Sequence, residues 1–271
     1  MSTPFPGPTK RMARTKQVAG ATIFTAFVFA TTFSFAATTS TGGYFDVGEI
    51  MVYITALVMG PYVGAFAGGV GSMLSDALLA PQFAPGTLVI KAAEGFIVGY
   101  LGQKGFRGLP TRMQKGMGVL LAAAVALIVG VVGAVDFPDV SLTLGQLGFT
   151  PTASTPDVSL SLAIWALLAA AAFAVTLFVS ARVGPRFTWV ALAIFAGGGV
   201  MVAGYFLYET QVLRLGLASP TAEIPVNVLQ AVLGLIVAPP VAARVQGIFH
   251  REITGDLRGT GGVGKEAPKV P

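Results

Sequence analysis

Long stretches without a charged side chain, five of them about as long as one membrane-spanning helix, constrain the fold more than any other feature of the sequence. An α-helix of about 20 residues covers roughly 30 Å, the thickness of the hydrocarbon core of a bilayer. Because 54% of the residues are hydrophobic and only 11% are charged, the chain has too few polar side chains to cover a soluble globule. We therefore predict an all-α fold, a polytopic transmembrane helix bundle. The charge-free stretches are residues 18–37, 116–135, 158–181, 187–208 and 224–243.

Two more regions carry helices that are less obvious. Residues 47–80 are too long for one span and contain the pair Gly60-Pro61, where proline lacks a backbone donor and disfavours helix in the residue before it. We predict two helices there, separated at this pair. Residues 86–104 form a further helix despite the charged residues inside them. The prediction is eight spans in all.

The basic residues support this count, because short loops rich in Lys and Arg remain in the cytoplasm. The opposite side receives residues 136–157, which contain three aspartates and no Lys or Arg, and elsewhere only Arg214. The pattern predicts a protein of the cytoplasmic membrane with both termini in the cytoplasm. With eight spans, the residues on the cytoplasmic side are Lys10, Arg11, Arg14, Lys16, Lys104, Arg107, Arg112, Lys115, Arg182, Arg186, Arg244 and Arg251.

Three regions follow from this topology. Residues 1–17 form a basic cytoplasmic segment, and the apolar run after it is too long for a cleaved signal, whose core has about 7 to 15 residues. Residues 18–249 form the transmembrane helical domain. Residues 250–271 are rich in Gly and charged residues and end in a Pro-containing segment, so we predict a disordered cytoplasmic tail.

The tail contains a motif that imitates a nucleotide-binding loop. Residues 259–265 read GTGGVGK, but Glu266 follows where a magnesium-binding Ser or Thr belongs, and the setting lacks the strand and helix of a working P-loop. The chain has no cysteine and one histidine, His250, so neither a thiolate metal site nor a paired-histidine site can form. We expect no catalytic residues, no metal, no cofactor and no nucleic-acid partner, and hence a protein that is not an enzyme.

Ionisable residues inside apolar regions point to function, because a charge at membrane depth costs a few kcal/mol and marks a ligand or ion path. Asp46, Asp76, Lys91 and Glu94 lie in the apolar region that follows residue 43. The predicted topology places them near the outer surface. The last two predicted helices add polar groups at the same depth, namely Tyr205, Tyr208, Glu209, Glu223, Asn227 and Gln230.

Rings together with a few hydrogen-bonding groups describe a pocket for a small molecule. Lys91 and Glu94 are three residues apart, so they share a helical face and partly neutralise each other. The alternative interpretation is that the tyrosines anchor the membrane interface and that the more superficial acids cap helix starts. The predicted substrate-binding residues are Tyr44, Asp46, Glu49, Lys91, Glu94, Tyr205, Tyr208, Asn227 and Gln230.

Small residues spaced four apart indicate close helix packing. They recur as Gly64 with Gly68 and as Gly95 with Gly99. Ala26 and Ala30 repeat the spacing on the first predicted helix, where either the bundle interior or a partner subunit can cover them.

Several short motifs occur together in an order that resembles one family of membrane proteins. The chain resembles an S component of an energy-coupling factor (ECF) transporter, of the riboflavin-type group, over residues 18–104 and about 195–245. In chain order the motifs are residues 44–49 (YFDVGE), Gly60-Pro61 with the glycine-rich helix after it, residues 91–95 (KAAEG), 204–209 (GYFLYE) and 223–230 (EIPVNVLQ).

The resemblance implies a membrane-embedded subunit that captures a vitamin-like small molecule from outside the cell, with riboflavin as the leading candidate. It also implies a transmembrane T component and two cytoplasmic ATPases as partners, and a toppling motion in the bilayer. The small-residue face at Ala26 and Ala30 would contact the T component. The family usually has six helices, so the helical pair over about 115–182 is interpreted as an insertion.

Two other functions fit the same residues. In a stand-alone secondary transporter, Asp76 and Glu94 would carry protons or cations. The three glycines at residues 197–199 would then interrupt the predicted helix over residues 187–208. In a structural subunit of a membrane complex, the small-residue faces would bind partners and no ligand would be needed.

Overall fold

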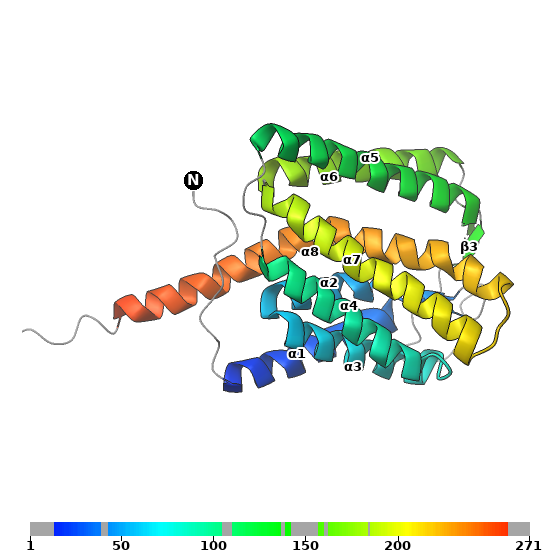
Figure 1. The fold of residues 1–271 in the computed structure, drawn as a ribbon, viewed down its shortest axis with the longest axis horizontal. Coiled ribbons are helices and arrows are strands. Elements are labelled where there is room, and N and C mark those ends of the chain that lie inside the picture. Colours follow the sequence, from blue (N-terminus) through cyan, green and yellow to red (C-terminus); the bar gives the residue numbers. More distant parts are fainter. Residues whose placement is uncertain are drawn as a thin grey trace, which may run out of the picture.

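The computed structural model of the protein describes residues 14–38, 43–104, 110–136, 139–141, 157–159, 162–183 and 185–259. Eight α-helices lie within these residues (Figure 1): α1 Arg14–Ser34, α2 Gly48–Met59, α3 Pro61–Leu79, α4 Ala84–Lys104, α5 Thr111–Asp136, α6 Leu162–Val183, α7 Pro185–Leu207 and α8 Ala218–Gly259. Two short antiparallel pairs of strands connect helices, β1 Ala37–Thr38 with β2 Tyr44–Phe45, and β3 Asp139–Ser141 with β4 Asp157–Ser159. A π-helical turn, η1 Tyr208–Val212, continues α7.

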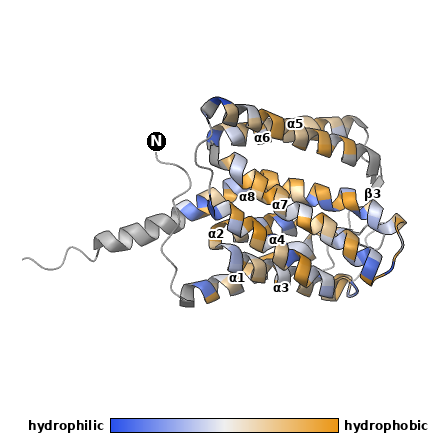
Figure 2. Cartoon of the chain, in the orientation of Figure 1, coloured by the Kyte–Doolittle hydropathy of each residue, from blue (hydrophilic) through white to orange (hydrophobic). Residues whose placement is uncertain are grey.

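The helical content and the length of the helices confirm a transmembrane bundle. Among the described residues, five helices are long and apolar enough to cross a membrane, namely α1, α3, α6, α7 and α8. Hydrophobic residues recur along the helices, as the orange segments of the ribbon show (Figure 2). The apolar parts of α2 and α5 are shorter, and α2 has only 12 residues. At 1.5 Å per residue α2 covers about 18 Å, which is less than the hydrocarbon thickness.

The predicted break at Gly60-Pro61 is confirmed. Helix α2 ends at Met59 and α3 begins at Pro61. Gly60 has φ of +89°, a backbone conformation that a side chain disfavours, and its N–H donates to the carbonyl oxygen of Ala56 at 3.0 Å. Pro61 lacks a donor but occupies the first helical position, where no acceptor would be available.

The expected interruption of α7 at residues 197–199 is wrong, because α7 is an unbroken helix there. These glycines serve packing instead. A Cβ atom at Gly197 would lie 2.5 Å from a methyl group of Val98, and one at Gly198 would lie 2.9 Å from the Cβ of Ala231. The feature that favoured a broken-helix secondary transporter is therefore a site of close contact between α7, α4 and α8.

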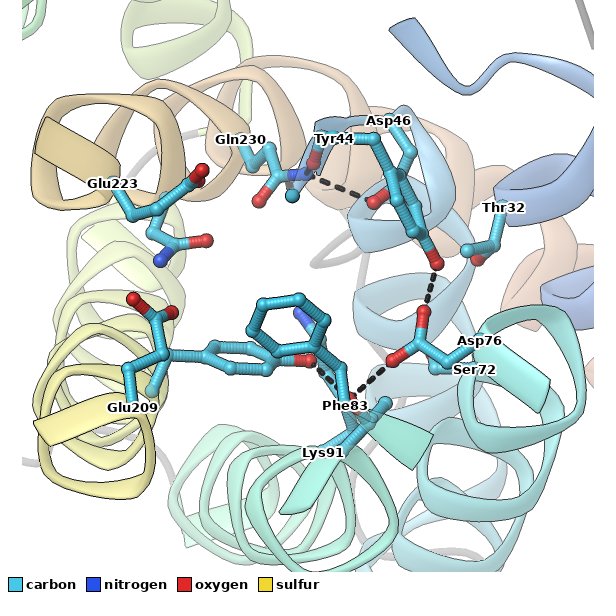
Figure 3. A pocket seen from close by; sticks show the side chains of 14 residues that line it. Thr32, Tyr44, Asp46, Ser72, Asp76, Phe83, Lys91, Glu209, Glu223 and Gln230 are labelled. Carbon is cyan, nitrogen blue, oxygen red and sulfur yellow. Dashed lines mark hydrogen bonds between the residues drawn. The ribbon is translucent and has the colours of Figure 1, made fainter. Parts of the chain in front are cut away.

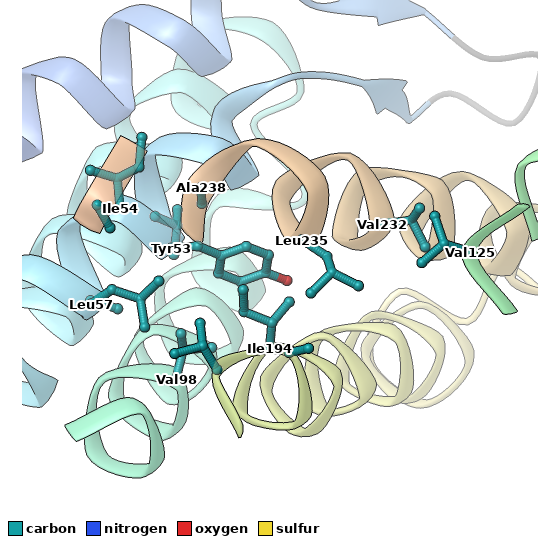
Figure 4. Packing of buried hydrophobic residues seen from close by; sticks show 14 of the residues in the cluster. Tyr53, Ile54, Leu57, Val98, Val125, Ile194, Val232, Leu235 and Ala238 are labelled. Carbon is teal, nitrogen blue, oxygen red and sulfur yellow. The ribbon is translucent and has the colours of Figure 1, made fainter. Parts of the chain in front are cut away.

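The helices form a layered bundle (Figure 1). Helix α3 packs against α1 and α4, α4 packs against α7, and α8 packs against α2 and α7. The apolar core lies between α2, α4, α7 and α8 (Figure 4), where the ring of Tyr53 is surrounded by Val98, Ile194 and Leu235. Tyr53 links this core to the charged residues of α4, since its hydroxyl donates to Glu94.

The pair α5 and α6, which corresponds to the predicted insertion, packs mainly on itself along one edge of the bundle (Figure 1). It reaches the rest of the bundle through α7 and α8, with Val125 of α5 beside Val232 of α8 (Figure 4). Helix α8 continues to Gly259, beyond residue 250 where we predicted that a disordered tail begins. Most of the P-loop-like motif, residues 260–265, lies outside the described residues.

The contact between α3 and α4 requires glycine. A Cβ atom at Gly95 would overlap the backbone carbonyl of Gly64, and one at Gly99 would lie 2.7 Å from the Cα of Pro61. Backbone atoms cannot move aside as the end of a flexible side chain can. The predicted spacing of small residues therefore marks the closest approach of these two helices.

We expect Gly95→Ala to destabilise the protein by about 1–3 kcal/mol, because the added methyl group forces α3 and α4 apart. Gly199→Ala is the matched control, since a Cβ there meets nothing within 4 Å. The control should be neutral or stabilising by up to about 1 kcal/mol, as Ala favours helix over Gly. Thermal and denaturant unfolding in detergent measure both, and equal stability of the two variants would contradict the proposed packing.

Candidate functional site

Polar side chains from separate segments meet at one end of the bundle, which we call the pocket end. It is formed by the ends of α1, α3 and α7, by β2 and the segment before α2, and by the start of α4, η1 and the start of α8. A cavity lies between them (Figure 3), with about 480 Å³ of empty space including its opening.

Most of the predicted binding residues surround this cavity. Glu49 and Glu94 do not line it but lie against Lys91, which does. Tyr208 is also absent from the lining, and its hydroxyl donates instead to the carbonyl oxygen of Gln82 at 2.9 Å. The predicted residues that line the cavity are Tyr44, Asp46, Lys91, Tyr205, Asn227 and Gln230.

Asp76 joins three of the surrounding segments. One of its carboxylate oxygens accepts a hydrogen bond from the hydroxyl of Tyr44, and the other accepts one from Thr87. The Thr87 hydroxyl also lies 2.9 Å from the hydroxyl of Tyr205 on α7. The chain of contacts from β2 through α3 and α4 to α7 fixes two aromatic rings at the cavity wall (Figure 3).

A second set of contacts joins α8 to the segment before α2. The side-chain amide of Gln230 donates to Asp46 Oδ2 at 2.8 Å, and the N–H of Gly48 donates to Asp46 Oδ1 at 2.6 Å. Burial raises the pKa of Asp46 to about 6, and the positive charge of Lys91 opposes this shift. Asp46 thus acts as an acceptor that holds Gln230 at the cavity.

Lys91 is the positive charge of the cavity wall, and it is buried with two carboxylates. Its Nζ pairs with Glu49 and lies 3.3 Å from Glu94 Oε2. Glu94 Oε1 accepts a further hydrogen bond from the hydroxyl of Tyr53 at 2.7 Å. Lys91 Nζ also lies 5.6 Å from the ring centre of Tyr205. The spacing of Lys91 and Glu94 predicted their pairing, whereas the contact with Glu49 arises only when α2 packs against α4.

Several lining residues were not in the predicted set. The sequence analysis identified Asp76, Glu209 and Glu223 as polar residues at this depth, and this signal would have justified adding them to the predicted binding residues. Thr32, Ser72 and Thr87 are single hydroxyl residues in apolar helices and gave little signal, and Phe83 comes from the turn between α3 and α4. The missed residues are Thr32, Gly43, Ser72, Asp76, Phe83, Thr87, Glu209 and Glu223.

Among the described residues that line the cavity, two buried oxygens have no hydrogen-bond partner, Glu209 Oε2 and Thr32 Oγ1. Glu209 is 2% exposed and lies in η1, where the π-helical turn follows α7. Unpartnered buried polar groups are costly unless something else satisfies them, so they are candidates for contact with a ligand. In the part of the chain that the structure describes, no group of three or more His, Cys, Asp or Glu is arranged to hold a metal ion.

Ala26 and Ala30 lie away from this cavity. Both are exposed on α1, whereas Val28 between them is buried in the core. The interior of the bundle therefore does not cover this small-residue face, so the first of the two expected packing partners is ruled out.

Comparison with known proteins gives a family match for the first half of the chain. The sequence model of the family described as "ECF-type riboflavin transporter, S component" matches residues 12–150. The matched region contains Tyr44, Asp46 and Lys91, while Tyr205 and Asn227 lie beyond it.

One curated relative covers a shorter region. A protein of Pyrococcus woesei described as "Uncharacterized protein in gap 3'region" is 53% identical over 58 residues. This alignment includes 21% of the present chain and 39% of the relative, so the chain spans about two fifths of the length of that protein.

We expect Lys91→Met to destabilise the protein by about 3 kcal/mol, because Glu49 and Glu94 would then be buried without a counter-charge. The triple variant Lys91→Met, Glu49→Gln, Glu94→Gln removes the charges together and should regain most of the loss. Unfolding in detergent measures both. If the triple variant were no more stable than the single one, side-chain packing rather than charge pairing would explain the effect.

Proposed function

The chain belongs to the ECF-type riboflavin transporter S component family, and from this premise we propose that it is the substrate-binding subunit of an ECF-type importer. It captures a vitamin-like small molecule from outside the cell, and partner subunits drive the uptake with ATP. The observation that carries the proposal is the cavity at the pocket end, in which aromatic and hydrogen-bonding side chains from separate helices converge.

The lining suits a planar heteroaromatic ligand. Tyr44, Phe83 and Tyr205 supply rings for stacking, and Asn227 and Gln230 supply amides. Riboflavin is the first compound to test, because the family description names it. The proposed binding set is the predicted one, with Glu49 and Glu94 acting through Lys91.

The partners follow from the family. An S component works with a transmembrane T component and two ATPases, and this chain binds substrate and is not itself an enzyme. We assign the contact with the T component to the exposed face at Ala26 and Ala30. The family's toppling motion would carry the loaded cavity to the cytoplasm.

The orientation that we propose puts the pocket end outside and both termini in the cytoplasm. The distribution of basic residues supports it, since Lys104 ends α4, Arg112 lies in the first turn of α5 and Arg182 lies in the last turn of α6, all at the end opposite to the cavity. The membrane is then the cytoplasmic membrane.

We expect the purified protein to retain a small molecule, and riboflavin to raise its melting temperature. Asn227→Ala should weaken riboflavin binding about 10-fold or more, since it removes a buried hydrogen-bonding group from the cavity wall. Gln211→Ala, an exposed neighbour of Glu209, is the control and should bind normally. Native mass spectrometry, ligand extraction and fluorescence titration provide the measurements.

Two results would overturn this function. If nothing is retained and no vitamin shifts the melting temperature, the chain is not a substrate-binding subunit. If the chain alone in liposomes accumulates solute from a proton or sodium gradient, it is a secondary transporter instead.

We expect the double variant Ala26→Phe, Ala30→Phe to abolish vitamin uptake while riboflavin binding to the purified protein persists. Bulky rings on α1 would block a partner that packs closely on small residues. Ala196→Phe, which alters an exposed position on α7, is the control and should still transport. Uptake of labelled riboflavin by cells that co-express the T component and the ATPases measures this, and normal uptake by the double variant would place the interface elsewhere.

A further inference from the structure

We infer that Glu209 determines the charge class of the ligand: the bound molecule presents a hydrogen-bond donor or a positive charge to Glu209, and anionic, phosphorylated forms of the same molecule are rejected. The inference rests on the proposed function, since it concerns the same cavity. It adds a specificity residue that lies outside the stretch matched by the family, residues 12–150.

The acids at the cavity differ in what they already bind. Asp46 accepts hydrogen bonds from Gly48 and Gln230, and Asp76 accepts them from Tyr44 and Thr87. These two carboxylates are therefore satisfied within the protein. Their role is to position the residues of the cavity wall, and they offer a ligand no carboxylate oxygen that lacks a partner.

Lys91, the one lysine among the described lining residues, does not offset the charge of the acids. Lys91 pairs with Glu49 and Glu94, so this buried group carries one positive and two negative charges when all three are ionised. The lining itself contains Lys91 as a base and Asp46, Asp76, Glu209 and Glu223 as acids. With these groups ionised, the cavity has an excess of negative charge, and no described lining residue supplies a free cation for a phosphate.

Glu209 differs from Asp46 and Asp76 because one of its carboxylate oxygens accepts no hydrogen bond within the protein. It is 2% exposed, its Oε2 has no hydrogen-bond partner, and its carboxylate points into the cavity (Figure 3). Thr32 Oγ1, on the far side of the cavity from Glu209, is also unpartnered. The π-helical turn of η1 places Glu209 at this position, as such turns often do at functional sites.

The chemistry of a carboxylate then defines the ligand. An ionised carboxylate only accepts hydrogen bonds, so it requires an N–H, O–H or cationic group opposite. Bonds to an ionised acceptor are about twice as strong as neutral ones. A phosphate brought to the same place would meet like charge in a poorly screened site.

The test compares matched ligand pairs that differ by one phosphate: riboflavin with riboflavin 5′-phosphate, and thiamine with thiamine monophosphate. Dissociation constants are measured on the purified full chain in detergent. For a pair that binds, we expect the phosphorylated member to bind about 100-fold or more weakly, and Glu209→Gln to reduce that ratio about 10-fold or more. Gln211→Glu, which adds an exposed carboxylate on the same turn, is the control and should leave the ratio within about threefold.

The melting temperature of the ligand-free variants separates specificity from structure. Because Glu209 Oε2 is buried without a hydrogen-bond partner, Glu209→Gln should melt at or above the temperature of the unmodified protein. A marked fall in melting temperature would show that Glu209 is a structural residue and would overturn the inference.

The binding results distinguish the two proposals. Tight binding of a phosphorylated ligand, or a phosphate penalty that Glu209→Gln leaves unchanged, overturns the role of Glu209 while the substrate-binding function persists. If no ligand of either pair binds and none is retained on purification, the proposed function is overturned and this inference with it.

Discussion

The buried pairing of Lys91 with Glu49 and Glu94 is the interaction on which the pocket end depends. It ties α2 to α4, while Tyr53 carries the contact from Glu94 into the apolar core. Each of these charges would be expensive to bury alone, so none can leave the cluster without the others. The cluster thus sets the positions from which Lys91 reaches the cavity and from which the segment before α2 presents Asp46.

Close helix contacts make this arrangement possible. Gly64 and Gly95 bring the backbones of α3 and α4 together, and Gly197 and Gly198 bring α7 against α4 and α8. Helices that approach so closely leave little room for displacement, which suits a cavity whose wall comes from several segments. The pair α5 and α6 packs outside this region, so the candidate site is built without it.

The sequence predicted the composition of the site better than its arrangement. Lys91, Asn227 and Gln230 were identifiable because polar groups are rare in apolar helices. Tyr208 was predicted on the same grounds, yet its ring packs at Gly86 and its hydroxyl bonds to Gln82, since one helical residue can turn away from a cavity that its neighbours face. Thr87 and Thr32 were missed because a single hydroxyl in an apolar helix can be satisfied by the helix backbone, as Thr25 and Thr55 are.

By itself, the sequence determined the membrane location, the helices and the break at Gly60-Pro61, because hydrocarbon favours apolar, internally hydrogen-bonded segments and the Gly-Pro pair combines a flexible residue with one that lacks a backbone donor. Only the tertiary structure decided which polar groups satisfy each other and which face the cavity. Asp76 and Glu209 look alike in sequence, yet Tyr44 and Thr87 donate hydrogen bonds to both carboxylate oxygens of Asp76. Glu209 Oε2, in contrast, has no hydrogen-bond partner. That difference comes from packing between segments far apart in the chain, to which local sequence pattern does not extend.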